Sequence, residues 1–195
     1  MPVYIDMIDL TSACQRTADV LAGVTDQQLA LPTPCETLRL DEVVAHVGGL
    51  ALAFTAAARK DFGPLTDTPP TDGAQLDAGW RSAYPQRLAA LATAWRDPDA
   101  SQGMTRAGGV DLPGEIAGSV ALAEVVIHGW DIARAIGQPY ECVPATVHAC
   151  LAHLAQFNTS GTEGMFGPAV PIADDAPDLD RVIALSGRDP AWRAP

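Results

Sequence analysis

The stretch Ala123-Glu-Val-Val-Ile-His-Gly-Trp-Asp131 is the most informative part of this sequence for both the fold and the chemistry. Within it, Glu124 and His128 stand four residues apart, and on an α-helix such positions share one face, with Cβ atoms about 5–6 Å apart. The surrounding run is apolar, and a carboxylate buried there without a partner is costly. Far upstream, His46 lies in a second apolar run, Val43-Val-Ala-His-Val-Gly-Gly49. Two histidines and one glutamate form a ligand set that leaves a coordination position open for chemistry.

The residues alone leave other interpretations of these side chains open. Glu-x-x-x-His recurs by chance on many helices, so Glu124 and His128 are also explained as a surface pair that supports the helix. His46 is also explained as a core histidine bonded to a backbone carbonyl. Asp131 follows His128 by three residues, and it either orients a ligand histidine or forms an ion pair with Arg134.

Hydrophobic periodicity predicts an all-α chain. Apolar residues recur at spacings of three and four over several segments, which loops rich in Pro and Gly separate. The predicted helices are residues 6–23, 39–60, 75–96, 115–136 and 144–158. Pro85 inside the third of them predicts a kink or a break. Residues 61–74 and 97–114 are predicted loops, the second with Gly108-Gly109 and a short strand.

This pattern favours a four-helix bundle with an additional C-terminal helix and an irregular tail. The 195 residues fit a single domain, 1–195, in which residues 160–195 form a mostly irregular tail packed on the bundle. Within that tail, only Leu179–Leu185 has a regular pattern.

Charge and composition narrow the classes of function. The net charge of −12, from 12 basic and 24 acidic residues without a Lys/Arg cluster, argues against nucleic acid as a partner. An acidic surface also repels anionic lipid. No run of eighteen apolar residues predicts a membrane span, and the N-terminus lacks the basic residues of a secretory signal, so we expect a cytoplasmic protein. The four cysteines are scattered and are expected to be free thiols.

Four motifs carry a resemblance to a known family. They are Thr33-Pro-Cys35, Asp41-Glu-Val-Val-Ala-His-Val47, Glu124-Val-Val-Ile-His-Gly-Trp-Asp-Ile-Ala133 and Ser186-Gly-Arg-Asp-Pro-Ala-Trp192. Through them, nearly the whole chain resembles the DinB/YfiT-like four-helix superfamily. Within that superfamily it is similar to the actinobacterial branch that contains the mycothiol-dependent maleylpyruvate isomerase N-terminal domain.

The resemblance implies a divalent metal held by His46, Glu124 and His128. Zn²⁺ is the first expectation for two imidazoles and a carboxylate, and Ni²⁺, Fe²⁺ or Mn²⁺ also fit. The resemblance further implies a low-molecular-weight thiol, mycothiol or a similar one, at the open position, where a metal deprotonates it. The thiolate would attack a small electrophilic substrate, as in a thiol S-transferase or isomerase. Members of the family often dimerise, so the resemblance also allows a homodimer.

Two other hypotheses compete with this enzyme. A non-catalytic metal-binding or regulatory interaction module would carry the same ligands without thiol-dependent turnover. A structural bundle that holds no metal would not respond to a chelator. Elsewhere, Cys35 is expected to be an inert thiol rather than a nucleophile, although it lies near the start of the second helix. His148 and His153 are five residues apart, so they share a helix face poorly and are not expected to be ligands.

Overall fold

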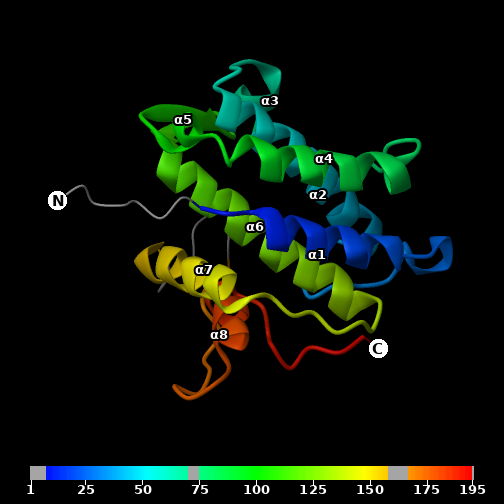
Figure 1. Cartoon of the computed structure of the whole chain (residues 1–195). Coiled ribbons are helices and arrows are strands. Elements are labelled where there is room, and N and C mark those ends of the chain that lie inside the picture. Colours follow the sequence, from blue (N-terminus) through cyan, green and yellow to red (C-terminus); the bar gives the residue numbers. More distant parts are fainter. Residues whose placement is uncertain (1–7, 70–74, 158–166, 195) are drawn as a thin grey trace.

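The computed structural model describes residues 8–69, 75–157 and 167–194 of the chain. A bundle of four α-helices forms its centre (Figure 1). These helices are α1 (Thr11–Ala22), α2 (Leu40–Arg59), α4 (Trp80–Ala94) and α6 (Gly114–Ala135). Both α1 and α2 pack against α4 and against α6, so the four helices close a ring around a shared interior. The predicted all-α fold with a four-helix bundle is confirmed.

The remaining elements extend the bundle at two places. The helices α7 (Pro144–Phe157) and α8 (Asp178–Leu185) lie on one side, with α7 packed on α6 and α8 on α7 (Figure 1). The connections hold η1 (Asp26–Gln28), α3 (Pro64–Asp67), α5 (Pro98–Ser101) and an antiparallel hairpin of β1 (Met104–Ala107) and β2 (Val110–Pro113). The two predicted loops therefore carry short helices that the sequence pattern did not predict, and α8 is the regular segment expected in the tail.

Two predicted helices begin later than their apolar pattern. In α1 the first residue is Thr11, and its backbone N–H donates a hydrogen bond of 2.9 Å to the carboxylate of Asp9, just before the helix. The predicted residues 6 and 7 lie outside the described part of the chain. In α4 the first residue is Trp80 rather than residue 75, since Gly79 precedes it with a φ of 75°.

Of the two outcomes predicted at Pro85, a kink or a break, the break is wrong. The helix α4 runs through Pro85 without interruption to Ala94. Pro85 has no N–H, so the helix lacks the bond to the carbonyl of Arg81. The neighbouring side chains of Tyr84 and Leu88 are almost completely buried, and their packing on the rest of the bundle favours a continuous helix.

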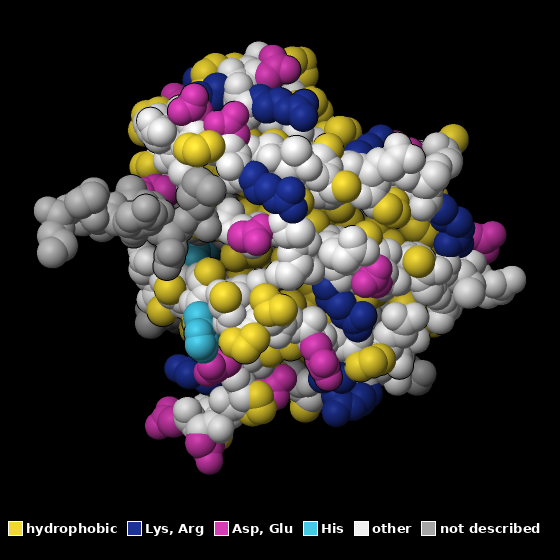
Figure 2. Space-filling view, viewed as in Figure 1, with side chains coloured by type: hydrophobic (Ala, Val, Ile, Leu, Met, Phe, Trp, Pro, Cys, Tyr) yellow, Lys and Arg dark blue, Asp and Glu magenta, His cyan; other side chains and the backbone are white. Residues whose placement is uncertain are grey.

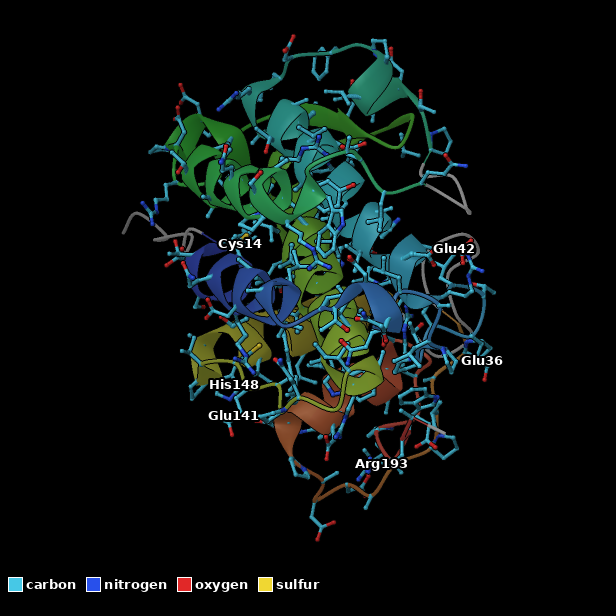
Figure 3. All side chains as sticks on the ribbon, turned by 90° about the vertical axis from the view of Figure 1, so that its right-hand side faces the viewer. Cys14, Glu36, Glu42, Glu141, His148 and Arg193 are labelled. Carbon is cyan, nitrogen blue, oxygen red and sulfur yellow. The ribbon has the colours of Figure 1, made fainter. Side chains whose placement is uncertain are left out.

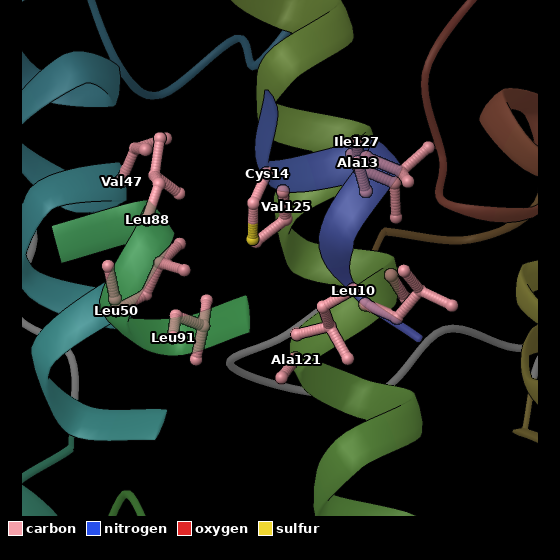
Figure 4. Close-up of a cluster of buried hydrophobic side chains, with 14 of the residues drawn as sticks. Leu10, Ala13, Cys14, Val47, Leu50, Leu88, Leu91, Ala121, Val125 and Ile127 are labelled. Carbon is pink, nitrogen blue, oxygen red and sulfur yellow. The ribbon is translucent and has the colours of Figure 1, made fainter. Parts of the chain in front are cut away.

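Interdigitated aliphatic side chains from all four bundle helices form the core, part of which Figure 4 shows. The members labelled there are Leu10, Ala13, Cys14, Val47, Leu50, Leu88, Leu91, Ala121, Val125 and Ile127. The helix α6 is buried on nearly all sides from Ala121 to Ala133. A helix that is apolar all round belongs in a protein interior. Any ionisable group on this part of α6 is therefore withdrawn from water.

The two longest helices, Leu40–Arg59 and Gly114–Ala135, have the length and apolar composition of membrane spans. However, 67% and 89% of their apolar windows are buried inside the bundle. Core helices pass the same test, so the packing of this bundle already explains their composition. On the face shown in Figure 2, basic and acidic side chains lie interspersed rather than in one continuous basic patch.

Candidate metal centre

His46, Glu124 and His128 converge where α2 packs on α6. His46 comes from α2, and the other two come from successive turns of α6. Oε2 of Glu124 lies 3.4 Å from Nε2 of His46 and 3.3 Å from Nε2 of His128. One potential ligand atom from each residue lies within 4.8 Å of the other two. The structure thus brings together the three side chains predicted as ligands.

The burial of these groups disagrees with the alternative interpretations of the sequence. The side chains of Glu124 and His128 are only 11% and 7% exposed, so they are not a surface pair. The partner of His46 is the Glu124 carboxylate rather than a backbone carbonyl. A carboxylate that is almost enclosed, with two imidazoles against one of its oxygens, needs a positive charge or protons shared among the three groups.

The two contacts of the Glu124 carboxylate have the spacing of ligands around a shared cation. Ligand atoms about 2.0–2.2 Å from a tetrahedral Zn²⁺ are separated from one another by about 3.3–3.6 Å. The two contacts of Glu124, at 3.4 and 3.3 Å, fall in that range. Charge-assisted hydrogen bonds between nitrogen and a carboxylate are usually shorter, at about 2.7–2.9 Å. The donor set, two imidazoles and one carboxylate, also suits Zn²⁺.

The electrostatics of the cluster favour a positive charge at the same point. Burial would raise the pKa of Glu124, but hydrogen bonds and charge from His128 and His46 outweigh burial, so this pKa is well below its ordinary value. Burial likewise opposes the charged form of His128, and its contacts with Asp131 and Glu124 nevertheless raise its pKa. Each shift has its cause in the neighbouring groups of opposite charge, the imidazoles for Glu124 and the carboxylates for His128. A metal cation would satisfy that charge in place of protons.

Asp131 lies behind His128, on the side away from Glu124. Its Oδ2 is 3.1 Å from Nδ1 of His128, and the side chain of Asp131 is completely buried. Such a contact fixes the tautomer of a histidine so that Nε2 is free to accept a metal. The predicted alternative partner, Arg134, instead donates a hydrogen bond to the carbonyl of Pro190. The cation that contacts Asp131 is Arg188, at 3.4 Å.

Sequence reasoning assigned no role to Arg188. Its separation of 57 residues from Asp131 gives no periodic signal. The only trace was its place in the motif Ser186–Trp192, which carried the resemblance but no function.

Other candidate residues lie at or outside the edge of the cluster. Burial raises the pKa of the Cys35 thiol, with nearby Arg188 opposing the rise, so Cys35 is protonated as expected for an inert cysteine. His148 is exposed and pairs with Asp178. His153 is buried on α7, and burial lowers its pKa, while the charge of Glu124 opposes that shift. His153 is therefore close enough to the cluster to feel its field.

Comparison with known proteins agrees with this fold. Residues 10–133 match the family model of the mycothiol maleylpyruvate isomerase N-terminal domain. The chain belongs to this family. The matched residues include His46, Glu124, His128 and Asp131, whereas Arg188 lies beyond them. The predicted resemblance is thereby confirmed.

Similar proteins and structures cover nearly the whole chain. Two uncharacterized proteins of Mycobacterium tuberculosis, from the strains CDC 1551 / Oshkosh and ATCC 25618 / H37Rv, are each 25% identical over 191 residues, which is 93% of this chain and 98% of theirs. The crystal structure of a mycothiol-dependent maleylpyruvate isomerase matches with a TM-score of 0.62 and 19% identity, covering 93% of this chain and 89% of that one. A His-to-Ala mutant of such an isomerase matches with a TM-score of 0.55 and 20% identity, covering 78% and 71%. At these identities the structural matches establish the shared fold.

Proposed function

We propose that this protein is a divalent-metal-dependent enzyme that uses a low-molecular-weight thiol of the mycothiol type for S-transfer or isomerisation. His46, Glu124 and His128 are the proposed ligands, and Zn²⁺ is the proposed metal, with Ni²⁺, Fe²⁺ and Mn²⁺ as chemically acceptable substitutes. The observation that carries the proposal is the convergence of two imidazoles on one oxygen of a buried carboxylate. Membership of the mycothiol maleylpyruvate isomerase N-terminal domain family supports the choice of thiol.

Each residue of the cluster has a defined task in this proposal. When bound to three protein ligands, a divalent cation lowers the pKa of a thiol at its open position and so supplies a nucleophile at neutral pH. Glu124 contributes the negative charge that holds the cation, and the two histidines contribute neutral nitrogen ligands. Asp131 keeps the proton of His128 on Nδ1, which directs Nε2 toward the cation. The apolar walls of α2 and α6 exclude water that would compete with the thiol.

The protein's own thiols are poor nucleophiles, which is why an external thiol is required. All four cysteines are free. Burial raises the pKa of Cys14 and Cys150 to about 12. It also raises the pKa of Cys35 and of Cys142. Since the thiolate is the reactive form, none of these groups is activated for attack at neutral pH.

The proposed substrate is a small electrophile, to which the thiolate adds or from which it displaces a leaving group. A solved structure of the same fold is titled a mycothiol-dependent maleylpyruvate isomerase, which makes addition to an activated double bond a natural first reaction to test. Because reduced low-molecular-weight thiols and free cysteines belong to a reducing compartment, we place the protein in the cytoplasm as part of the same proposal. A homodimer stays a prediction from the resemblance.

Metal content in matched histidine variants tests the ligand assignment. The purified wild-type protein is expected to bind one divalent ion per chain, measured by mass spectrometry of the metal after dialysis. His128→Ala is expected to lose stoichiometric metal. His148→Ala is the control, since His148 lies exposed on α7 (Figure 3) and is expected to bind metal as the wild type does. Full metal occupancy in His128→Ala would reject the assignment.

A thiol panel then tests catalysis. The metal-loaded protein is mixed with mycothiol, glutathione, cysteine or 2-mercaptoethanol and an electrophile such as a maleyl compound, and product formation is followed by chromatography. Thiol-dependent turnover that disappears in Glu124→Gln supports the enzyme. Metal binding without turnover for any thiol would instead identify the non-catalytic metal-binding module, the second hypothesis from the sequence.

A further inference from the structure

Arg188 is a buried cation that the C-terminal segment places behind the candidate metal centre. Its side chain is 8% exposed, and its Nη2 lies 3.4 Å from Oδ2 of Asp131. The same oxygen accepts the 3.1 Å contact with Nδ1 of His128. Arg188, Asp131 and His128 therefore form one continuous chain of contacts that ends at the proposed metal position. Arg188 lies outside residues 10–133, the part of the chain that the family model matches.

The end of α8 fixes Arg188 in this position. After α8, Gly187 takes a left-handed conformation with a φ of 81°, and this turns the backbone back over the helix. The N–H of Arg188 then donates to the carbonyl of Ile183 at 3.2 Å. Its Nη1 donates to the carbonyl of Ser186 at 2.8 Å. With the backbone and one end of the guanidinium held, the other end faces Asp131.

The Arg188–Asp131 contact is half of a two-bond fork. Guanidinium and carboxylate groups pair best through two parallel bonds, for example from Nε and Nη2 to the two carboxylate oxygens. Here Nη2 contacts Oδ2, while Nε of Arg188 and Oδ1 of Asp131 are both buried without a hydrogen-bond partner among the described residues. The unsatisfied Nε is a donor and the unsatisfied Oδ1 is an acceptor, and they lie on side chains already in contact. A second hydrogen bond between them would satisfy both groups and complete the fork.

The charges of the buried groups have a simple balance. Glu124 and Asp131 each contribute one negative charge, and Arg188 contributes one positive charge because a guanidinium does not lose its proton in proteins. When they bind a metal, the two ligand histidines are neutral. A divalent cation in the proposed site therefore leaves the enclosed centre with one net positive charge. One monoanionic ligand brings that total to zero.

On the basis of the proposed function, we propose that Arg188 is a positioning residue of the centre. It holds Asp131 against His128, and its charge gives the metal-loaded centre one net positive charge, so that the open position selects a monoanion such as a thiolate. The charge acts at close range in a nearly dry environment, where screening by salt is weak. Two described titratable groups near the centre add no charge to this balance, since burial raises the pKa of Cys35 and lowers that of His153.

Anion binding to the cobalt-loaded protein tests this inference. Co²⁺ is added to saturation to wild type and variants, and azide or 2-mercaptoethanol is titrated while the visible and near-ultraviolet absorption of Co²⁺ is recorded. In Arg188→Met we expect both probes to bind about tenfold more weakly or worse, as for other residues that support a metal ligand. Arg188→Lys keeps the charge and is expected to retain most of the affinity. Arg193→Met is the matched control, because Arg193 lies exposed in the same segment (Figure 3).

A charge-restoring double variant separates this role from a merely structural one. Arg188→Met combined with Asp131→Asn removes one charge of each sign, so the loaded centre again carries one net positive charge and anion affinity is expected to recover relative to Arg188→Met alone. If Arg188→Met binds both probes as tightly as wild type, or if the double variant shows no recovery, the inference is wrong. If Arg188→Met does not fold, Arg188→Lys and the double variant decide, because both keep one net positive charge: loss of anion affinity in both would show the inference to be wrong. Failure of the wild-type protein to bind Co²⁺ would instead refute the proposed function.

Discussion

Two charge clusters of this protein differ in a way that contact distances alone do not reveal. The hairpin cluster consists of Asp67, Arg106 and Asp111. Its guanidinium makes two bonds to Asp111 at 2.7 and 3.2 Å and a third to Asp67 at 3.0 Å. The buried cluster consists of His46, Glu124, His128, Asp131 and Arg188, and its contacts span 3.1–3.4 Å.

Contact distance alone would rank the hairpin cluster as the stronger one, and burial reverses that order. The side chains of the hairpin cluster are 37–62% exposed, so water competes for every bond and salt screens every charge. Those of the buried cluster are 0–17% exposed, and each charge there depends on its neighbours for stabilisation. We therefore expect the cluster with the shorter contacts to matter less for stability than the cluster with the longer ones. Two predictions test this contrast directly, and two further ones test the packing and the thiols around the buried cluster.

The largest expected effect comes from removing one member of the buried pair. Asp131→Asn leaves Arg188 buried without a counter-charge, and breaking such a pair costs about 3–5 kcal/mol. Asp111→Asn removes a carboxylate with shorter contacts in the hairpin cluster, and we expect no measurable loss. Urea unfolding of the metal-free proteins measures both. Equal losses in the two variants would contradict the claim that burial rather than distance ranks the clusters.

Metal addition should stabilise only the buried cluster. A cation at one hundred times its dissociation constant adds about 2.7 kcal/mol, or roughly 5–11 °C in melting temperature for a chain of this size. We expect this shift for Zn²⁺ with wild type and with Arg106→Met. It should be absent in Glu124→Gln, and a chelator should reverse it. A melting temperature that ignores both Zn²⁺ and chelator would favour the structural bundle without metal.

The helices that carry the candidate ligands could be predicted from the sequence, because they depend on local patterns. The apolar repeat predicted α2, α6 and α7 to within one residue at each end, since the period of a helix is a property of neighbouring residues. The four-residue spacing of Glu124 and His128 predicted a shared helix face. His46 joined them because α2 and α6 are neighbours in the bundle.

Contacts between distant segments could not be predicted from the sequence in the same way. Arg188 reaches Asp131 through the turn after α8, and no periodicity links residues that a loop brings together. The start of α4 and its continuity through Pro85 were also misjudged. Gly79 sets the start of the helix, and tertiary packing keeps the helix continuous through Pro85 against the local propensity.

A smaller effect concerns how closely other segments approach the site. Gly129 follows His128 on α6, and a Cβ there would overlap the hydroxyl groups of Thr17 and Tyr140. Gly129→Ala should therefore destabilise the protein by about 1–3 kcal/mol. Gly49→Ala on α2 is the control, because a Cβ at this exposed helical position meets nothing within 4 Å and should stabilise the helix by about 0.5–1 kcal/mol. Losses of the same size in both variants would contradict the close packing of α1 on the site helix.

The smallest effect is chemical and leaves stability unchanged. Burial raises the pKa of Cys14 and Cys150 to about 12, so both should remain protonated and resist iodoacetamide at pH 8. Cys35 and Cys142 are only half-buried and should react earlier, yet more slowly than free cysteine because burial raises their pKa too. Mass spectrometry of peptides after timed labelling gives the four rates. Labelling of Cys35 faster than free cysteine would reveal an activated thiol beside Arg188, and the nucleophile would then belong to the protein rather than to an external thiol.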